Sequence, residues 1–413
     1  MLHWVNQFSV CCFLDNNQYD FPQHSRECIA GAGIYVSTRR TSNQALEGLR
    51  DFPGLEDDWV FGHLSYDLKN EIDHLQSTLP DRTGFADLFF FVPEYVLQLD
   101  ENQLQIGSFR PDHEAIFSSI ETHSLPGPLR KMNEVDVRQR MDKESYIQTI
   151  NSIKDHIKRG DCYELNFCQE FYAEDIEIDP VAIFLKLGSI SPNPFAAFYK
   201  TDNAYLLCAS PERYIKKTGQ RLVSQPIKGT SIRFVNDKER DDLQRDGLLQ
   251  SQKERSENVM VVDLVRNDLA RVCVEGSVVV DELFGIYSFP QVHQMISTIS
   301  GELKPGKDFV DIIRATFPMG SMTGAPKRKV MQLIEKYEKS RRGLFSGAVG
   351  YITPGGDFDF NVVIRSILYN ANDHYLSFST GSAITHYSDP EAEYAECMLK
   401  GEAIRRVLEG EGE

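Results

Sequence analysis

The chain has 413 residues, a formal net charge of -17 at pH 7, 41% hydrophobic residues and 25% charged residues. This length and composition are typical of a globular protein with two or three domains, or with one large duplicated domain, around a sizeable core. Because the acidic excess repels polyphosphates, we expect neither a nucleic-acid partner nor an anionic membrane partner.

The cysteines and the N-terminus indicate the compartment. The 8 cysteines include no C-x-x-C pair, and no histidines stand near them at the spacing typical of a zinc site. We therefore expect reduced thiols and no zinc. Residues 1–17 lack the basic leader and long apolar core of a signal peptide. No later apolar stretch is long enough to span a bilayer, so the sequence predicts a soluble cytoplasmic protein.

Residues 1–110 have the pattern of strands and loops. Residues 89–99 and 103–109 predict two strands joined by a hairpin turn at residues 100–102. The following stretch, 122–140, contains two prolines, a glycine and mixed charges. It predicts a boundary between an N-terminal region, 1–125, and a second domain, 140–410, or at least a long surface crossing.

After this boundary, helical and strand patterns alternate. Asp142 can cap a helix that ends at Gly160, and a long helix is expected over 251–268. Other helices are expected at 180–188, after residue 327, and from Pro390 onward. The expected strands cover 162–171, 195–200, 204–210, 213–217, 221–227, 347–352, 360–369 and 375–380. Hairpins mixed with separate helices favour an α+β architecture over a doubly wound parallel sheet.

One hairpin brings an acid near an amine. If residues 218–220 form its turn, Glu212 lies opposite Pro226 or Ile227, one step from Lys228. The pair can be a surface ion pair worth less than about 1 kcal/mol. Alternatively, it is an acid/base group beside an amine nucleophile, which requires partial burial of the lysine.

Two pairs of glutamates lie on the apolar faces of helices. Glu254 and Glu257 share a face with Val261 and Leu264, while Glu393 and Glu396 precede Ile404 on the last helix. Inward carboxylates require a cation or a proton. The two pairs could together hold Mg²⁺, which prefers oxygen ligands; the alternative is ordinary i,i+4 pairing of Glu396 with Lys400.

Two loops of small residues and one buried arginine complete the candidates. The loop before residue 327 contains Thr323, and the segment after residue 379 contains Gly381, Ser382 and Ala383. Backbone amides in either loop could bind a carboxylate or phosphate, although glycine at such turns is usually only a geometric requirement. Arg365 stands in a strand that is apolar on both faces, where it needs an acid on the protein or on a ligand.

These segments, taken together and in order, resemble the chorismate-utilising enzymes: anthranilate synthase component I, aminodeoxychorismate synthase component I, and the isochorismate and salicylate synthases. The segments are SPERY, QPIKGT, SENVMVVDLVRNDLARV, FPMGSMTGAPK, GAVGYI, VVIRSI, STGSAI and DPEAEYAE. The resemblance is dense over 146–408 and thinner before residue 110. It implies large mixed or antiparallel sheets packed face to face and flanked by helices, with a chorismate-binding catalytic domain over 140–410.

Two positions separate the members of this family, and a third departs from the pattern of some members. Anthranilate synthases are expected to have a small residue in PIAGT, whereas PIKGT with Lys228 resembles the aminodeoxychorismate synthases, whose lysine is the nucleophile. Isochorismate and salicylate synthases have a water-activating lysine where this chain has Glu164. Gln294 stands at the position of a histidine found in some members, and strand alternation turns the neighbouring His293 to the opposite face.

The resemblance therefore implies amination of chorismate at C4 for 4-aminobenzoate and folate synthesis. Lys228 would be the nucleophile and Glu212 the acid and base. Glu257 and Glu396 would hold Mg²⁺, with Glu254 and Glu393 direct or through water. The implied substrate-binding groups are Arg365, Tyr351, Thr323, Gly381, Ser382, Ala383 and Lys400.

The implied ammonia source is a separate protein. The chain has no cysteine in a G-x-C-x-G elbow, so a separate glutamine amidotransferase subunit is the expected partner. Three other functions stay open at this point. One is anthranilate synthase component I, which aminates the ortho position, and another is a non-catalytic protein that binds chorismate or tryptophan. The third is a structural or interaction protein, whose melting temperature neither Mg²⁺ nor chorismate would raise.

Overall fold

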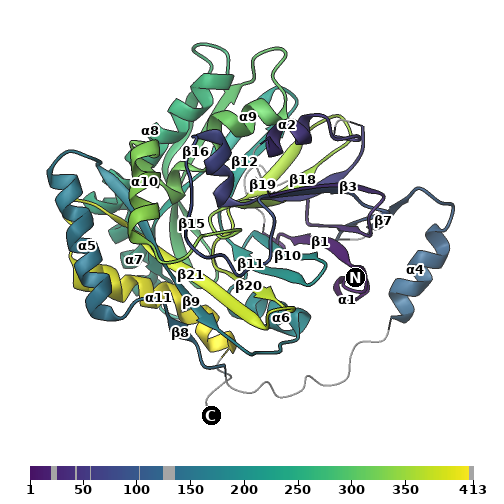
Figure 1. The fold of residues 1–413 in the computed structure, drawn as a ribbon, viewed down its shortest axis with the longest axis horizontal. Helices are drawn as coiled ribbons and strands as arrows, with labels where there is room; N and C mark the ends of the chain where they lie inside the picture. The colour runs from purple at the N-terminus through teal and green to yellow at the C-terminus, as the bar shows by residue number, and fades with distance from the viewer. Residues whose placement is uncertain (20–25, 42–43, 56, 102, 124–134, 409–413) are drawn as a thin grey trace.

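Two large β-sheets packed face to face, with helices on their outer sides, make up the computed structural model (Figure 1). The structure describes residues 1–19, 26–41, 44–55, 57–101, 103–123 and 135–408. Every strand pairing within these ranges is antiparallel. The α+β prediction, with its large sheets and flanking helices, is confirmed.

The strands divide between the sheets as follows. The first sheet has 11 strands, in the order β17 (Gly324–Ala325), β9 (Glu164–Ala173), β21 (Tyr375–Ile384), β20 (Ser366–Asn370), β11 (Ala204–Ser210), β10 (Phe195–Thr201), β1 (Val10–Asp15), β2 (Cys28–Ala32), β6 (Tyr95–Asp100) and β7 (Gln103–Ser108), with β8 (Arg138–Gln139) beside β9. The second has 10 strands, in the order β14 (Ile227–Ile232), β16 (Val292–Glu302), β13 (Arg221–Gln225), β12 (Arg213–Thr218), β19 (Phe358–Asn361), β18 (Ala348–Ile352), β4 (Val60–Leu64), β5 (Leu88–Val92) and β3 (Val36–Arg40), with β15 (Val279–Ser288) beside β16.

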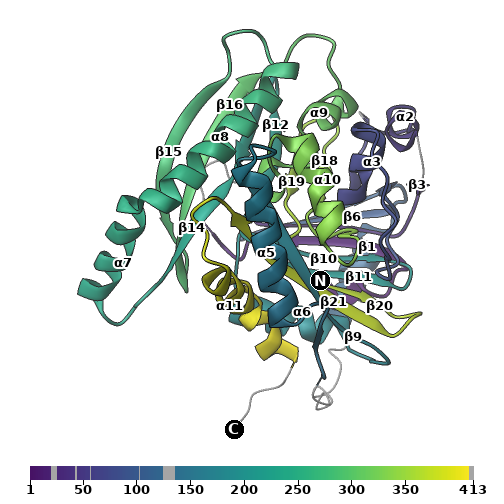
Figure 2. The same ribbon diagram turned by 60° about the vertical axis from the view of Figure 1, so that its left-hand side comes forward.

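The helices lie mostly on the outer faces of the sheets, although α7 projects at one side, beside β14 and β15 (Figure 2). They are α1 (Leu2–Val5), α2 (Ala45–Arg50), α3 (Lys69–Ile72), α4 (His113–Thr122), α5 (Lys143–Lys158), α6 (Pro180–Ile190), α7 (Lys238–Gln250), α8 (Gln252–Val272), α9 (Phe309–Thr316), α10 (Lys327–Tyr337) and α11 (Pro390–Leu408), with short 3₁₀ turns η1 (Tyr66–Leu68) and η2 (Gly320–Met322). One apolar core includes α5, α6, α11 and the first sheet, and another includes α8, α9 and both sheets. Among the described residues, no helix has the length and apolar character needed to cross a membrane.

Side-chain caps fix the starts of the helices that matter for the site. The Asp142 carboxylate accepts a hydrogen bond from the Ser145 amide at 2.8 Å at the start of α5. The Ser251 hydroxyl accepts from the Glu254 amide at 3.3 Å, and Asp389 accepts from the Ala392 amide at 2.9 Å. Such caps satisfy amides that have no partner within the helix, and the three helices begin where the sequence predicts.

Two of the expected strands are each divided between the sheets. Residues 89–99 do not form one strand: β5 belongs to the second sheet and β6 to the first, with Pro93 between them. Proline has no N–H for a strand ladder, which favours a break at that point. Residues 360–369 likewise divide into β19 and β20, and Arg365 lies between them with φ of 50°. The prediction that Arg365 lies within a strand is therefore wrong.

Strands from the N-terminal part of the chain belong to both sheets. β1 pairs with β10 in the first sheet, and β4 pairs with β18 in the second. The division into 1–125 and 140–410 stays a prediction, and these pairings show that hydrogen bonds join the two parts. Most of the predicted boundary stretch, 124–134, lies outside the described residues.

Candidate active site

Lys228 lies at an irregular point of β14. The pairing of β14 with β16 shifts register between Ile227 and Thr230, which places Lys228 in a β-bulge. Gly229 has φ of 92°, and a Cβ there would lie 3.0 Å from Glu254 Oε2. The left-handed backbone conformation therefore favours glycine, and a side chain there would also crowd Glu254 of α8 and Leu248 of α7. The Lys228 side chain, 11% exposed, donates a hydrogen bond from Nζ to Glu164 Oε1 at 3.1 Å.

Glu212 is buried between β11 and β12. The hairpin register agrees with the prediction, because Thr218 pairs with Arg221 and Arg213 pairs with Gln225. Burial raises the pKa of Glu212 to about 7, although hydrogen bonds from the Ser321 hydroxyl and the Ile227 amide, and the positive charges of Lys228 and Arg365, act in the opposite direction. A carboxyl group with this pKa can donate or accept a proton near neutral pH.

Acidic groups surround the Lys228 amine. Burial alone would lower the pKa of Lys228, but the charges of Glu164, Glu257 and Glu212 and the Glu164 hydrogen bond outweigh it, so the pKa is raised. The lysine is therefore an ammonium ion at neutral pH before any substrate binds. A nucleophilic role requires a nearby group that can accept its proton.

The four glutamates predicted to bind a metal are brought together by α8 and α11. Lys253 Nζ lies 3.9 Å from Glu257 Oε1, 3.9 Å from Glu393 Oε1 and 3.8 Å from Glu396 Oε2. Glu257 and Glu393 are buried, and each has a carboxylate oxygen without a hydrogen-bond partner in the described part of the chain. Glu254 is half-buried, one turn before Glu257.

These residues fit a hard divalent cation in their chemistry. All four are carboxylates, and the cation close to three of them is an ammonium whose side chain is 51% exposed. Unpaired buried carboxylate oxygens are costly unless a cation meets them. Within the described residues, however, no three acidic, histidine or cysteine side chains lie close enough together to hold a metal ion. The pairing of Glu396 with Lys400, expected as the alternative, is also present at 2.8 Å.

Gly381, Ser382 and Ala383 lie within β21. The sequence predicts a loop after the strand, and this prediction is wrong, because these residues pair with Cys168, Phe167 and Asn166 of β9. The Gly381 carbonyl instead accepts a hydrogen bond from Lys400 Nζ at 2.9 Å, on the edge away from β9. In an antiparallel strand the N–H of a residue points to the same side as its C=O, so the Gly381 amide also faces outward. A Cβ at Gly381 would lie 2.2 Å from the Phe167 carbonyl oxygen, which requires glycine.

Arg365 lies close enough to Glu212 for their charges to interact. Burial lowers the pKa of Arg365, and the Glu212 charge acts in the opposite direction. Within the described residues, no hydrogen bond or ion pair engages its half-buried guanidinium group. An arginine in such a position can bind a carboxylate on a ligand.

Two other predicted substrate residues have different surroundings. Thr323 is fully buried, and its hydroxyl donates to the Met319 carbonyl at 3.1 Å. Tyr351 packs near Trp59 and Phe61 and lines a cavity together with Asp15 and Arg213. Their roles in substrate binding stay predictions.

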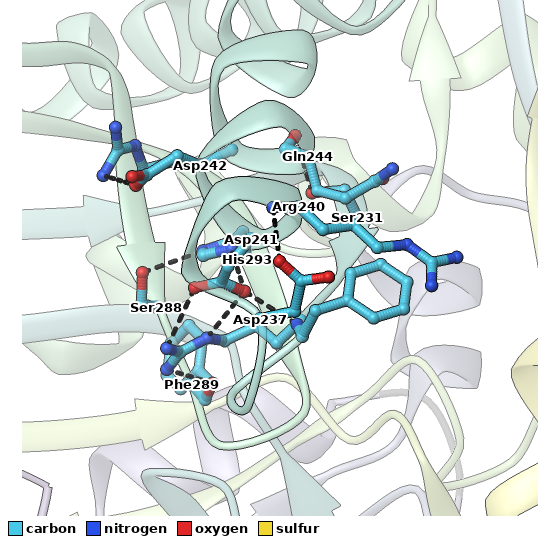
Figure 3. A network of polar contacts seen from close by, with 12 residues as sticks. Ser231, Asp237, Arg240, Asp241, Asp242, Gln244, Ser288, Phe289 and His293 are labelled. Atoms are coloured by element: carbon cyan, nitrogen blue, oxygen red, sulfur yellow. Dashed lines mark hydrogen bonds and ion pairs between the residues drawn. The ribbon is translucent and has the colours of Figure 1, made fainter.

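His293 is engaged outside the group of acids around Lys228. Figure 3 shows the network, in which His293 Nε2 lies 3.1 Å from Asp241 and Nδ1 lies 2.8 Å from the Ser288 hydroxyl. Hydrogen bonds from Arg233 and from the Phe234 amide lower the pKa of Asp241 to about 2. The network joins α7 to β14, β15 and β16. The neighbouring Gln294 is fully buried, and its amide atoms have no partner among the described residues.

Two contacts of the site lie outside the sequence predictions. The sequence indicates Glu164 only as a replacement for the lysine of other family members, yet Glu164 forms the ion pair with Lys228 from a different sheet. Lys253 lies four positions before Glu257, and that i,i+4 spacing could have indicated its position. No local pattern relates Glu164 to Lys228, because the contact depends on how the two sheets meet.

Comparisons with known proteins indicate the family and the fold. The family described as chorismate binding enzyme matches residues 16–406. Aminodeoxychorismate synthase component 1 of Escherichia coli (strain K12) is 38% identical over 351 residues, covering 85% of this chain and 77% of that protein. A probable chloroplastic aminodeoxychorismate synthase of Oryza sativa subsp. japonica is 32% identical; the match covers 87% of this chain and only 44% of the rice protein.

A solved structure supports the fold. Anthranilate synthase component I from Streptococcus pneumoniae TIGR4 aligns with a TM-score of 0.78 and 24% sequence identity, covering 94% of this chain and 93% of that one. At this identity the likeness indicates the fold alone.

Proposed function

The chain belongs to the chorismate-binding enzymes, and on that basis we propose that it aminates chorismate at C4 to give 4-amino-4-deoxychorismate, which leads to 4-aminobenzoate and folate. The observation that carries the proposal is the position of Lys228, whose amine is held by Glu164 and lies within the electrostatic reach of Glu212. A protein that only bound chorismate would have no need for a buried amine next to a carboxyl group with a pKa of about 7.

The first chemical step uses both groups. Lys228 attacks C2 of the ring, the ring double bonds shift, and the C4 hydroxyl departs with a proton from Glu212. Glu212 suits this role because burial keeps a substantial part of it protonated near pH 7. The product of this step is a covalent adduct on Lys228.

The second step regenerates the free Lys228 side chain. Ammonia attacks C4, the double bonds shift back, and the bond between C2 and Lys228 breaks. Glu212, now ionised, accepts a proton from the incoming nitrogen. Two displacements explain why the nitrogen ends at C4 rather than at C2.

Chorismate carries two carboxylates, so an acidic chain must provide local positive charge. Arg365 supports this role, since no group among the described residues pairs with its guanidinium. Lys400 and the outward edge of β21 at Gly381 and Ala383 provide further donors. Ser382, Thr323 and Tyr351 are retained in the proposed substrate site on the family resemblance.

The four glutamates on α8 and α11 would hold Mg²⁺, with Glu257 and Glu396 as ligands and Glu254 and Glu393 direct or through water. When bound, the ion would supply positive charge for the ring carboxylate of chorismate. The buried oxygens of Glu257 and Glu393 that accept no hydrogen bond in the described part of the chain support this assignment.

Ammonia would come from a separate glutamine amidotransferase subunit in the cytoplasm. The relative in Escherichia coli is named a component 1, which supports a two-component arrangement. The chain itself would bind and aminate chorismate.

Identification of the product tests this proposal. The purified chain is incubated with chorismate, Mg²⁺ and an ammonium salt, without glutamine, and the products are separated and identified by mass and absorbance. We expect 4-amino-4-deoxychorismate. Formation of 2-aminobenzoate would instead identify an anthranilate synthase component I, and chorismate binding without turnover would identify a non-catalytic binding protein.

A further inference from the structure

Glu164 is buried at the point where the two sheets meet. It is the first residue of β9, and β17 pairs with it through Ala325. Its side chain is only 2% exposed. Oε1 accepts the hydrogen bond from Lys228, while Oε2 has no hydrogen-bond partner among the described residues.

One of the two oxygens of this buried carboxylate therefore has no hydrogen bond from the described residues to offset the loss of water. A buried oxygen atom that lacks a hydrogen-bond partner is energetically unfavourable, so the geometry leaves Oε2 open to accept a proton. The donor already bonded to this carboxylate is the Lys228 ammonium, whose Nζ lies 3.1 Å from Oε1. Transfer of that proton converts a buried ion pair into two neutral groups.

Five acids among the described residues interact electrostatically with Lys228. They are Glu164 on β9, Glu212 before β12, Glu254 and Glu257 on α8, and Glu396 on α11. Within the described residues, only Glu164 lies within 4.0 Å of its amine in an ion pair. Glu212 has to deliver its own proton to the departing hydroxyl, so it is not available as the first acceptor.

From this geometry, and resting on the proposed function, we infer that Glu164 is the base that deprotonates the nucleophile. It takes the proton from the Lys228 ammonium as the amine attacks chorismate. Glu164 touches the reacting nitrogen itself, so its role is catalytic.

The step balances as follows. One proton moves from Nζ of Lys228 to Glu164, the Nζ–C2 bond forms, and the C4–O bond breaks as Glu212 protonates the hydroxyl to give water. After ammonia has added at C4 and given a proton to Glu212, the C2–Nζ bond breaks. The released amine takes its proton back from Glu164, and both carboxyl groups return to their starting states.

Single-turnover measurements on Glu164→Gln test the inference. The rate of the Lys228 adduct is followed by intact-protein mass spectrometry, with chorismate and Mg²⁺ but no ammonia, over about pH 6 to 9. Glutamine keeps the size of the side chain and cannot accept the proton. At neutral pH we expect adduct formation to slow by on the order of 10²–10⁴-fold. Because solvent must then remove the proton, the ratio of wild-type to variant rates should shrink about tenfold per pH unit.

Two further variants separate catalysis from structure. Glu164→Asp retains a carboxylate and should form the adduct at neutral pH, more slowly than the wild type but faster than Glu164→Gln. Tyr163→Phe, at an exposed neighbouring position, should match the wild type. Equal losses at every pH in both Glu164 variants, or a wild-type profile in Glu164→Gln, would overturn the inference. If the wild-type chain itself forms no adduct, the proposed attack by Lys228 is wrong, and so is the role of Glu164 as its base.

Discussion

Replacing Lys228 by alanine should abolish the covalent adduct and lower 4-amino-4-deoxychorismate formation by roughly 10⁴-fold. Alanine removes the only amine that forms an ion pair with Glu164 among the described residues. Ammonia alone would then have to displace the C4 hydroxyl without an intermediate. The measurement is the initial rate of product formation with chorismate, Mg²⁺ and an ammonium salt.

A matched lysine variant controls for general effects. Lys158 lies on α5 with a side chain that is 57% exposed, and its only described ion pair is with Asp155, three residues away on the same helix. Lys158→Ala should retain the wild-type rate. Full C4 amination by Lys228→Ala would contradict the lysine mechanism, whatever the behaviour of the control.

Replacing Glu212 by glutamine should slow adduct formation by on the order of 10²–10⁴-fold. The wild-type group acts as an acid in this step, so it must be protonated, and burial raises its pKa to about 7. The wild-type rate should therefore be highest below about pH 7 and decline as pH rises through that value. Glutamine does not titrate, so this decline should disappear from the pH profile of the variant.

The relevant comparison is the shape of the two pH profiles, measured as adduct formation by rapid quench and mass spectrometry. Glu302→Gln, an exposed position at the end of β16, should leave both the rate and the profile unchanged. If Glu212→Gln reproduces the decline around pH 7, then another group is the acid.

Among the elements that the sequence predicts, the helices agree with the structure better than the strands do, although α4, α7 and α9 are not predicted. The helices that follow Asp142, Ser251 and Asp389 begin where the sequence predicts, and in the structure each of these side chains caps its helix. The strand predictions are wrong where one apolar run passes from one sheet to the other, at Pro93 and at Arg365. An apolar run indicates burial, but it does not indicate which of two packed sheets receives each half.

The candidate site divides in a similar way. Helical spacing identifies Glu254, Glu257, Glu393 and Glu396 as inward-facing, and the structure brings both pairs close to Lys253. The hairpin register places Glu212 near Ile227, whose amide hydrogen-bonds it. The contact of Lys228 with Glu164 joins two sheets and residues 64 positions apart. It therefore depends on tertiary packing, which no local sequence pattern predicts.

The covalent adduct is the most direct test of the account. Wild-type protein is incubated with chorismate and Mg²⁺ in the absence of ammonia and glutamine, and its intact mass and peptides are then measured. We expect one addition per chain with the mass of chorismate less one water, located on Lys228. An unmodified chain that still forms 4-amino-4-deoxychorismate once ammonia is added would contradict it.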